Sequence, residues 1–253
     1  QVINEDGEVV EEWVSAAESH VIYALAPGNY TLHEVSAPTE DGYVRAEDVV
    51  FTVEESGEVQ QVSMKDDHTK VEISKTDITG ETEVEGAHLQ ILNQDGEVVE
   101  EWTSTNEPHL IEYLPVGEYT LHEESAPTES GYVRAEDVTF TVEETGEIQQ
   151  VSMKDDHTKV EISKTDITGE QEIEGALLQI LTPDGEVVEE WTSGNEPHYV
   201  EYLVPGDYVL HEESAPEGYL IAADVEFTVE ESGEVQQVSM VDEVPMGQLV
   251  IKK

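Results

Sequence analysis

The sequence contains no cysteine and few basic residues. The first shortage excludes disulfides, and the second excludes anionic partners. With no cysteine among 253 residues, no disulfide can cross-link the fold. Only 10 lysines and arginines stand against 60 aspartates and glutamates, so the formal net charge is −50. Because this charge repels phosphate groups, it excludes nucleic acids and anionic membrane surfaces as partners.

Long apolar runs and catalytic motifs are also missing. No run of about 18 apolar residues is present, so no membrane insertion is predicted. There is no signal peptide and no sorting tail, so both ends are interpreted as cuts in a longer protein. The sequence holds no GxSxG, no phosphate loop and no dinucleotide fingerprint. We therefore expect neither turnover catalysis nor a cofactor.

Nine histidines are present, but none has the spacing of a metal-ligand set. His33, His122 and His211 stand in "LHE" or its copies and point away from the apolar face of that segment. His68 and His157 lie between repeats. We interpret the histidines as surface residues and predict no metal site.

Internal repetition is the main positive feature. Near-copies of "GEVVEEW" place Trp13, Trp102 and Trp191 at intervals of 89 residues. A period near 90 residues indicates small independent domains rather than a solenoid. The predicted boundaries are 1–66 for a domain that lacks its first strand, 67–156 and 157–243 for complete domains, and 244–253 for a first or donor strand.

The sequence pattern of each repeat predicts an all-β domain. The copies "NEDGEVV", "NQDGEVV" and "TPDGEVV" place Asp-Gly between apolar stretches, which predicts hairpins. Six or seven short strands with turns about every 8–12 residues predict a β-sandwich. The segment "DHTK" at 67–70 and 156–159 is the whole spacer between repeats, so we expect a linear rod without flexible linkers.

Three charged residue types fall on the apolar faces of these strands. In "VEISKTD" at 71–77, alternation puts Val71 and Ile73 on one face with a lysine. The same reading of "YTLHE" and "QVSMKD" puts a glutamate and an aspartate on apolar faces. The lysines are Lys75 and Lys164, the glutamates Glu34, Glu123 and Glu212, and the aspartates Asp66, Asp155 and Asp242.

Burial of such a group has chemical consequences. An unpaired buried charge is very costly, so these groups are expected to pair or to neutralise. Burial raises the pKa of a carboxyl group and lowers that of a lysine, which leaves a neutral amine beside a protonated carboxyl. Fixed proximity then favours condensation to an amide. A buried salt bridge, or a lysine that reaches solvent at a strand end, is the alternative.

These motifs resemble a known family. The order "VEISKTDITG…LQILNQDGEVV…GEYTLHEESAPTESGY…FTV…VSMKD" is similar to the Cna protein B-type, or SpaA-like, domains of Gram-positive surface proteins and pilins. The likeness covers 71–156, 160–243 and most of 1–66. It implies a transthyretin-like, inverse immunoglobulin β-sandwich, often with a spontaneous intramolecular isopeptide bond.

Carried onto this sequence, the resemblance implies two such bonds. One would join Lys75 to Asp155 with Glu123 assisting proton transfer. The other would join Lys164 to Asp242 with Glu212 assisting. Many members of the family use asparagine as the acceptor, so aspartate is a departure, and water rather than ammonia would leave. The neighbouring acids Asp156 and Glu243 are out of phase with the apolar residues.

The resulting functional expectation is structural. We expect a stalk or fibre segment that is extracellular, at the cell surface or secreted, with other domains or copies of the same protein as partners. An adhesin module for a host or matrix ligand is the alternative. The ends suggest two readings: a fragment of a longer array, or head-to-tail assembly in which Lys253 bonds to Asp66 of the next chain with Glu34 assisting.

Overall fold

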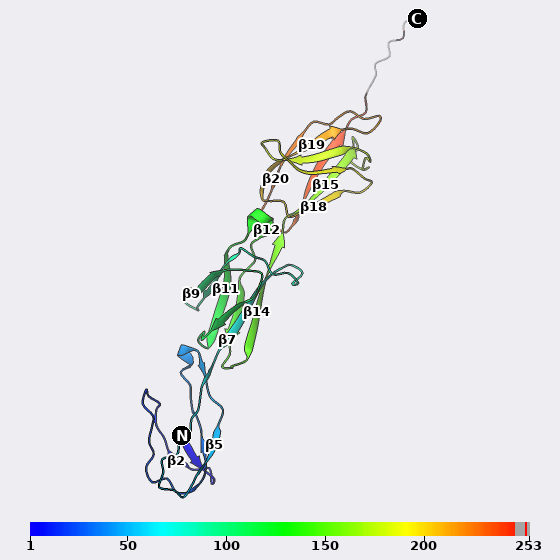
Figure 1. Ribbon diagram of the computed structural model, residues 1–253. Helices are drawn as coiled ribbons and strands as arrows, with labels where there is room; N and C mark the ends of the chain where they lie inside the picture. The colour runs from blue at the N-terminus through cyan, green and yellow to red at the C-terminus, as the bar shows by residue number, and fades with distance from the viewer. Residues whose placement is uncertain (246–250, 252–253) are drawn as a thin grey trace.

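The computed structural model describes residues 1–245 and 251 and shows three β-units arranged end to end, with the termini at opposite ends (Figure 1). We call them domain 1 (β1–β6), domain 2 (β7–β14) and domain 3 (β15–β21). The predicted all-β fold and linear rod are confirmed. Among the described residues, no helix is long and apolar enough to cross a membrane.

Domain 2 is a sandwich of two four-stranded sheets. Its elements are β7 (Lys70–Asp77), β8 (His88–Leu92), β9 (Val98–Thr103), β10 (His109–Glu112), β11 (Gly117–Ser125), η2 (Thr128–Ser130), β12 (Tyr132–Val133), β13 (Val138–Val142) and β14 (Ile148–His157). One sheet has the order β10-β7-β14-β12 and the other β13-β11-β8-β9. The first and last strands, β7 and β14, lie side by side and parallel.

Domain 3 repeats this arrangement. Its strands are β15 (Lys159–Asp166), β16 (Leu177–Leu181), β17 (Val187–Thr192), β18 (His198–Glu201), β19 (Gly206–Ser214), β20 (Val225–Val229) and β21 (Val235–Asp242). The sheets have the orders β18-β15-β21 and β17-β16-β19-β20, and β15 and β21 are parallel. An isolated bridge between Leu220 and Glu243 stands where domain 2 has β12.

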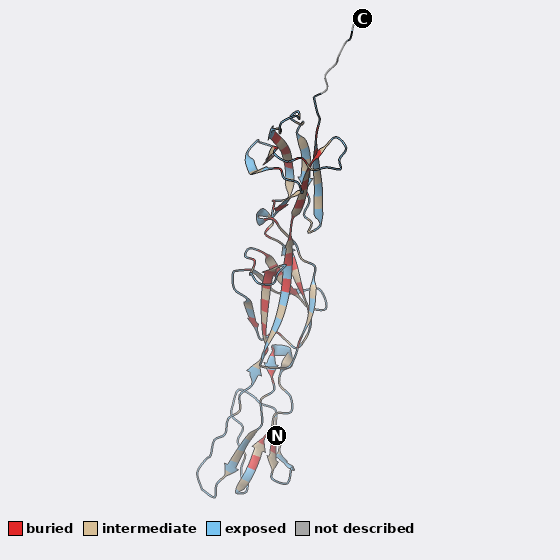
Figure 2. Cartoon of the chain, turned by 90° about the vertical axis from the view of Figure 1, so that its right-hand side faces the viewer, coloured by how far each residue is buried: buried red, intermediate tan, exposed pale blue. Residues whose placement is uncertain are grey.

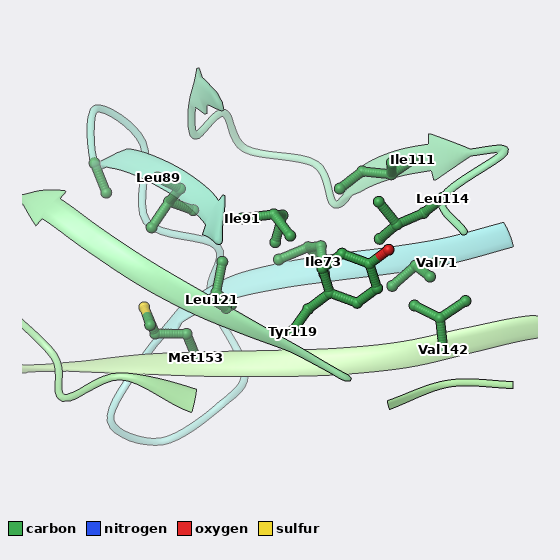
Figure 3. Packing of buried hydrophobic residues seen from close by; sticks show 11 residues of the cluster. Val71, Ile73, Leu89, Ile91, Ile111, Leu114, Tyr119, Leu121, Val142 and Met153 are labelled. Carbon is green, nitrogen blue, oxygen red and sulfur yellow. The ribbon is translucent and has the colours of Figure 1, made fainter. Parts of the chain in front are cut away.

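The cores of domains 2 and 3 lie between their sheets. Buried residues alternate with exposed ones along the strands, as Figure 2 shows. In domain 2, Val71 and Ile73 of β7 face Leu89 of β8 and Leu121 of β11 across the sandwich (Figure 3). Domain 3 has the matching cluster, which includes Ile162, Leu178 and Leu210. The side-chain period of two thus fixes which face is apolar.

Domain 1 is only half of this sandwich. Its elements are β1 (Val2–Asn4), β2 (Val9–Glu11), β3 (Gly28–Leu32), η1 (Thr39–Asp41), β4 (Tyr43–Val44), β5 (Val49–Val53) and β6 (Asp67–His68). One sheet, β2-β1-β3-β5, is complete, and β4 pairs only with β6. Residues 59–66 match the sequence of β14 but form no strand. A strand needs a hydrogen-bonded neighbour, and β14 finds it in β7, which has no counterpart among the described residues of domain 1.

Candidate functional site

Three strands bring the charged residues of domain 2 together. Lys75 follows Val71 and Ile73 on the inward face of β7, and β14 runs parallel to it with Met153 opposite Lys75. Asp155, two residues after Met153, points to the same face. Glu123 comes from β11 in the facing sheet, where it pairs with Leu89. The lysine and aspartate therefore approach from one sheet and the glutamate from the other.

The three side chains form a buried contact. The Nζ of Lys75 donates to Oδ1 of Asp155 in a very short contact and lies 2.9 Å from Oε2 of Glu123. The exposed fractions are 2% for Lys75 and 0% for Glu123 and Asp155. Two carboxylates and one ammonium would leave one net negative charge in the interior, which is costly.

Domain 3 has the same arrangement. The Nζ of Lys164 donates to Oδ1 of Asp242, again in a very short contact, and lies 3.2 Å from Oε1 of Glu212. Each of these three residues is 1% exposed. Because two independent copies coincide, the geometry follows from the repeated sequence rather than from one local accident.

A backbone amide holds each glutamate. The N–H of Ala135 donates to Oε2 of Glu123 at 2.6 Å, and the N–H of Ala222 donates to Oε2 of Glu212 at the same distance. This hydrogen bond fixes the orientation of each carboxylate. Sequence reasoning missed both amides, since alternation along a strand says nothing about a loop that folds back over it. The only available signal was the repeated loop "RAED" at 45–48 and 134–137.

The pKa values of the two aspartates are raised. Burial raises the pKa of Asp155 to about 7, and the hydrogen bond and charge of Lys75 only partly offset this rise. Burial also raises the pKa of Asp242. The Oδ2 atoms of both aspartates are buried without a hydrogen-bond partner among the described residues. Each site therefore combines an aspartate with a raised pKa, a second carboxyl group and an amine.

The other acceptor candidates lie elsewhere. Oδ1 of Asp156 receives a hydrogen bond from Nζ of Lys159 at 2.6 Å, at the boundary with domain 3. Glu243 is exposed. Neither carboxylate therefore lies beside Lys75 or Lys164.

Domain 1 holds only part of the constellation. Oε2 of the half-buried Glu34 accepts the N–H of Ala46 at 2.7 Å, which matches the two complete sites. Asp66 is exposed and lies outside any strand. Lys253, expected to bond to Asp66 of a neighbouring chain, lies outside the described residues.

The expectation that the histidines lie at the surface needs one correction. His157 is only 7% exposed and stacks on Tyr202, so its assignment to the surface was wrong. The reason is packing between domains, which the alternation within one repeat does not reveal. Over residues 1–245 and at 251, no group of three or more acidic or histidine side chains is arranged to hold a metal ion.

Comparisons with solved structures give partial likenesses. The Bacillus anthracis TIE protein is 28% identical over 87% of this chain, with a TM-score of 0.48, and this chain spans only 42% of it. A streptococcal ancillary pilin is 20% identical (TM-score 0.35; 87% of this chain, 76% of the pilin). The shaft pilin SpaA from Lactobacillus rhamnosus GG is 16% identical (TM-score 0.32; 72% of this chain, 99% of the pilin).

The comparison with protein-family models assigns the chain to a family, which the structural likenesses do not. No curated protein matches the chain significantly. The family model described as SpaA, a prealbumin-like fold domain, matches three consecutive stretches, residues 1–68, 69–157 and 158–244. Since these stretches cover nearly the whole sequence, the chain belongs to the SpaA family of prealbumin-like fold domains.

Proposed function

We propose that this chain is a structural segment of a bacterial surface or pilus-like fibre, and that an isopeptide bond forms spontaneously in each complete domain. The bonds are Lys75–Asp155 in domain 2 and Lys164–Asp242 in domain 3. The observation that carries the proposal is the burial of an amine against a carboxyl with elevated pKa, beside a second carboxylate. Its repetition in domain 3 supports the same chemistry there.

The reaction is a condensation. Glu123 takes a proton from the ammonium of Lys75, and the neutral Nζ attacks Cγ of Asp155. A C–N bond forms, and one carboxyl oxygen of Asp155 leaves as water after Glu123 passes a proton to it and takes another from Nζ. The overall change joins the ammonium of Lys75 and the protonated carboxyl of Asp155 into an amide plus one water, and the proton released ends on Glu123, so that the site stays neutral. Held proximity supplies an effective molarity of about 10⁵–10⁸ M, which offsets the unfavourable equilibrium in dilute solution.

The bond would suit a load-bearing fibre. Lys75 and Asp155 are 80 residues apart in sequence and lie on the first and last strands of the domain. A covalent tie at this place prevents a pulling force from separating β7 and β14. By analogy with a disulfide that closes a loop of this length, it contributes about 4–5 kcal/mol by restricting the unfolded chain.

Intact mass of the denatured chain tests the proposal. The expected mass is lower than that of the sequence by two water molecules, and fragmentation should join the peptides that contain Lys75 and Asp155, and Lys164 and Asp242. An unmodified mass would refute the crosslinks and leave buried ion pairs in their place.

A further inference from the structure

The boundary between successive domains is a single residue. Thr158 separates β14, which ends at His157, from β15, which begins at Lys159, and Thr69 separates β6 from β7 in the same way. One residue contributes two soft backbone dihedrals. A short connection alone therefore limits the distance between domains but leaves their relative rotation open.

Every polar group of Thr158, the connecting residue, makes a hydrogen bond. The N–H of Thr158 donates to the carbonyl of Gly131 in domain 2 at 3.0 Å, and its carbonyl accepts the N–H of Tyr202 in domain 3 at 3.0 Å. Its hydroxyl donates to the carbonyl of Leu203 at 2.6 Å. Thr158 is fully buried, so these bonds are shielded from water. The residue is thereby hydrogen-bonded to both domains.

Aromatic rings add a second set of contacts. The ring of His157 stacks on Tyr202 with centroids 4.0 Å apart and planes at 13°, while Tyr132 meets Tyr202 edge-on at 5.4 Å. Nε2 of His157 lies 3.1 Å from Oε1 of Glu201. Rings from both sides of the boundary thus restrict rotation about Thr158.

The boundary between domains 1 and 2 repeats these contacts. Thr69 bonds to the backbone of Gly42, Tyr113 and Leu114 at 2.9, 3.1 and 2.6 Å. The ring of His68 stacks on Tyr113 at 4.1 Å, with Tyr43 edge-on to Tyr113 at 5.5 Å. Two boundaries with the same contacts indicate that the residues, not chance packing, set the arrangement.

Glycines show how closely the domains approach. A Cβ added at Gly233 of domain 3 would overlap the carboxylate of Asp156, and one at Gly146 of domain 2 would overlap that of Asp67. Gly57, the same position in domain 1, has nothing within 4 Å. The carbonyl of Gly233 also accepts a hydrogen bond from Nζ of Lys159 at 3.0 Å. The glycine is thus sterically required only where a preceding domain packs against it.

We propose that these residues form an orientation-setting joint, a device that holds consecutive domains at one fixed rotation. The joint after domain 2 consists of Asp156, His157 and Thr158 with Tyr132, Tyr202 and Gly233. Because both boundaries use the same contacts, the rotation is the same at each, and equivalent faces of successive domains follow a regular helix along the rod. The proposal is independent of the isopeptide bonds, since it uses none of their residues.

The residues that follow domain 3 differ from those that follow domain 2. Val244 and Pro245 follow domain 3 at the positions that His157 and Thr158 occupy after domain 2. Proline has no N–H to donate, and valine has no ring to stack. Val244 and Pro245 therefore cannot make the contacts of His157 and Thr158, and the two residue pairs differ in the chemistry that the joint uses.

Spin-label distance measurements on the full chain test the joint, since the absence of cysteine allows labels at chosen positions. Thr139→Cys and Glu226→Cys are equivalent exposed positions in domains 2 and 3, and Val50→Cys with Thr139→Cys reports on the first boundary. Both pairs should give narrow distance distributions. Replacement of His157 by valine and Thr158 by proline should broaden the second distribution about twofold, because the stack on Tyr202 and the bonds to Gly131 and Leu203 are lost and ψ at position 158 is no longer held. The first distribution should stay unchanged.

Two single substitutions test the joint in case the double replacement at 157 and 158 disturbs folding. Tyr202→Ala removes the stack, and the loop should tolerate it because Ala24 occupies the same position with φ 62°, against 63° for Tyr202. Gly233→Ala should also broaden or shift the second distribution, whereas Gly57→Ala should change neither. A broad distribution in the parent chain, or a second distribution unchanged in both width and position in Tyr202→Ala and Gly233→Ala, would overturn the proposal.

Discussion

The backbone amide of Ala135 and the ammonium of Lys75 meet the same oxygen, Oε2 of Glu123, at 2.6 and 2.9 Å. This shared contact holds the carboxylate against the amine. Asp155 accepts no such backbone donor, and burial raises its pKa. The two carboxyl groups thus have different surroundings.

The first prediction concerns Glu123. Glu123→Gln should abolish the crosslink in domain 2 and leave that in domain 3, because only the base beside Lys75 is lost. Peptide mapping of the denatured chain measures this, and domain 2 should lose about 4–5 kcal/mol of stability. The neighbouring exposed Glu124→Gln is the matched control and should retain both crosslinks. A full yield of the Lys75–Asp155 bond in Glu123→Gln would exclude the assigned role.

The second prediction is a pH dependence in the uncrosslinked domain. The pKa of Asp155 is raised from 3.8 to about 7 in the folded state, chiefly by burial, so the native state binds the proton more tightly than the unfolded state. Its contribution to stability is therefore full below about pH 4 and declines as pH rises toward 7. Melting of domain 2 in Glu123→Gln should show such a decline, which should end at a lower pH because Glu123 also raises the pKa of Asp155.

The control for this decline adds Asp155→Asn to Glu123→Gln, which removes the titrating group. The difference in melting temperature between the two variants should change between about pH 4 and 7 and level off above. The crosslinked parent has no Asp155 carboxyl to titrate and should lack this contribution. A difference that is constant across the range would show that Asp155 has an ordinary pKa.

Much of the site could be predicted because its residues lie on strands. The apolar neighbours Val71 and Ile73 define the buried face, and a period of two places Lys75 on it. The same argument applied to residues 59–66 was wrong, since a strand also needs a hydrogen-bonded neighbour. Alternation describes a strand's faces but not whether another strand is present to pair with it.

The joint could not be predicted from the sequence either, and the reason differs from that at residues 59–66. "DHT" consists of polar residues that are typical of a surface loop, yet His157 and Thr158 are buried between two domains. Their burial depends on how the loops of Tyr132 and Tyr202 approach in space, which no local pattern encodes. The period of the repeats locates the boundary, and only the fold shows what packs there.

The third prediction tests the acceptor. Asp155→Asn should still form the bond, because attack of Lys75 on the amide carbon gives the same product with ammonia as the leaving group. The mature protein should therefore have the same mass as the crosslinked parent, although its unreacted sequence differs. Lys75→Met with Asp155→Asn is the control that keeps the unreacted mass. An unreacted amide side chain at position 155 of the single variant would show that the site requires a carboxylic acid.

The last prediction concerns the open edge of the sandwich, where a tryptophan and a histidine join the two sheets. Trp191 of β17 stacks on His198 of β18 at 4.4 Å, and Trp102 stacks on His109 at the same distance. Nε2 of His198 lies 2.7 Å from Glu189, whereas the matching distance from His109 to Glu100 is 3.6 Å. His198→Ala should thus destabilise domain 3 by about 1–2 kcal/mol, and His109→Ala should destabilise domain 2 by about 1 kcal/mol. Denaturant unfolding measures both losses of stability. In a Glu189→Gln background, the stability lost on His198→Ala should fall to the value for His109→Ala. Equal costs for the two histidines with Glu189 intact would show that the stack, and not the contact with Glu189, accounts for the whole contribution.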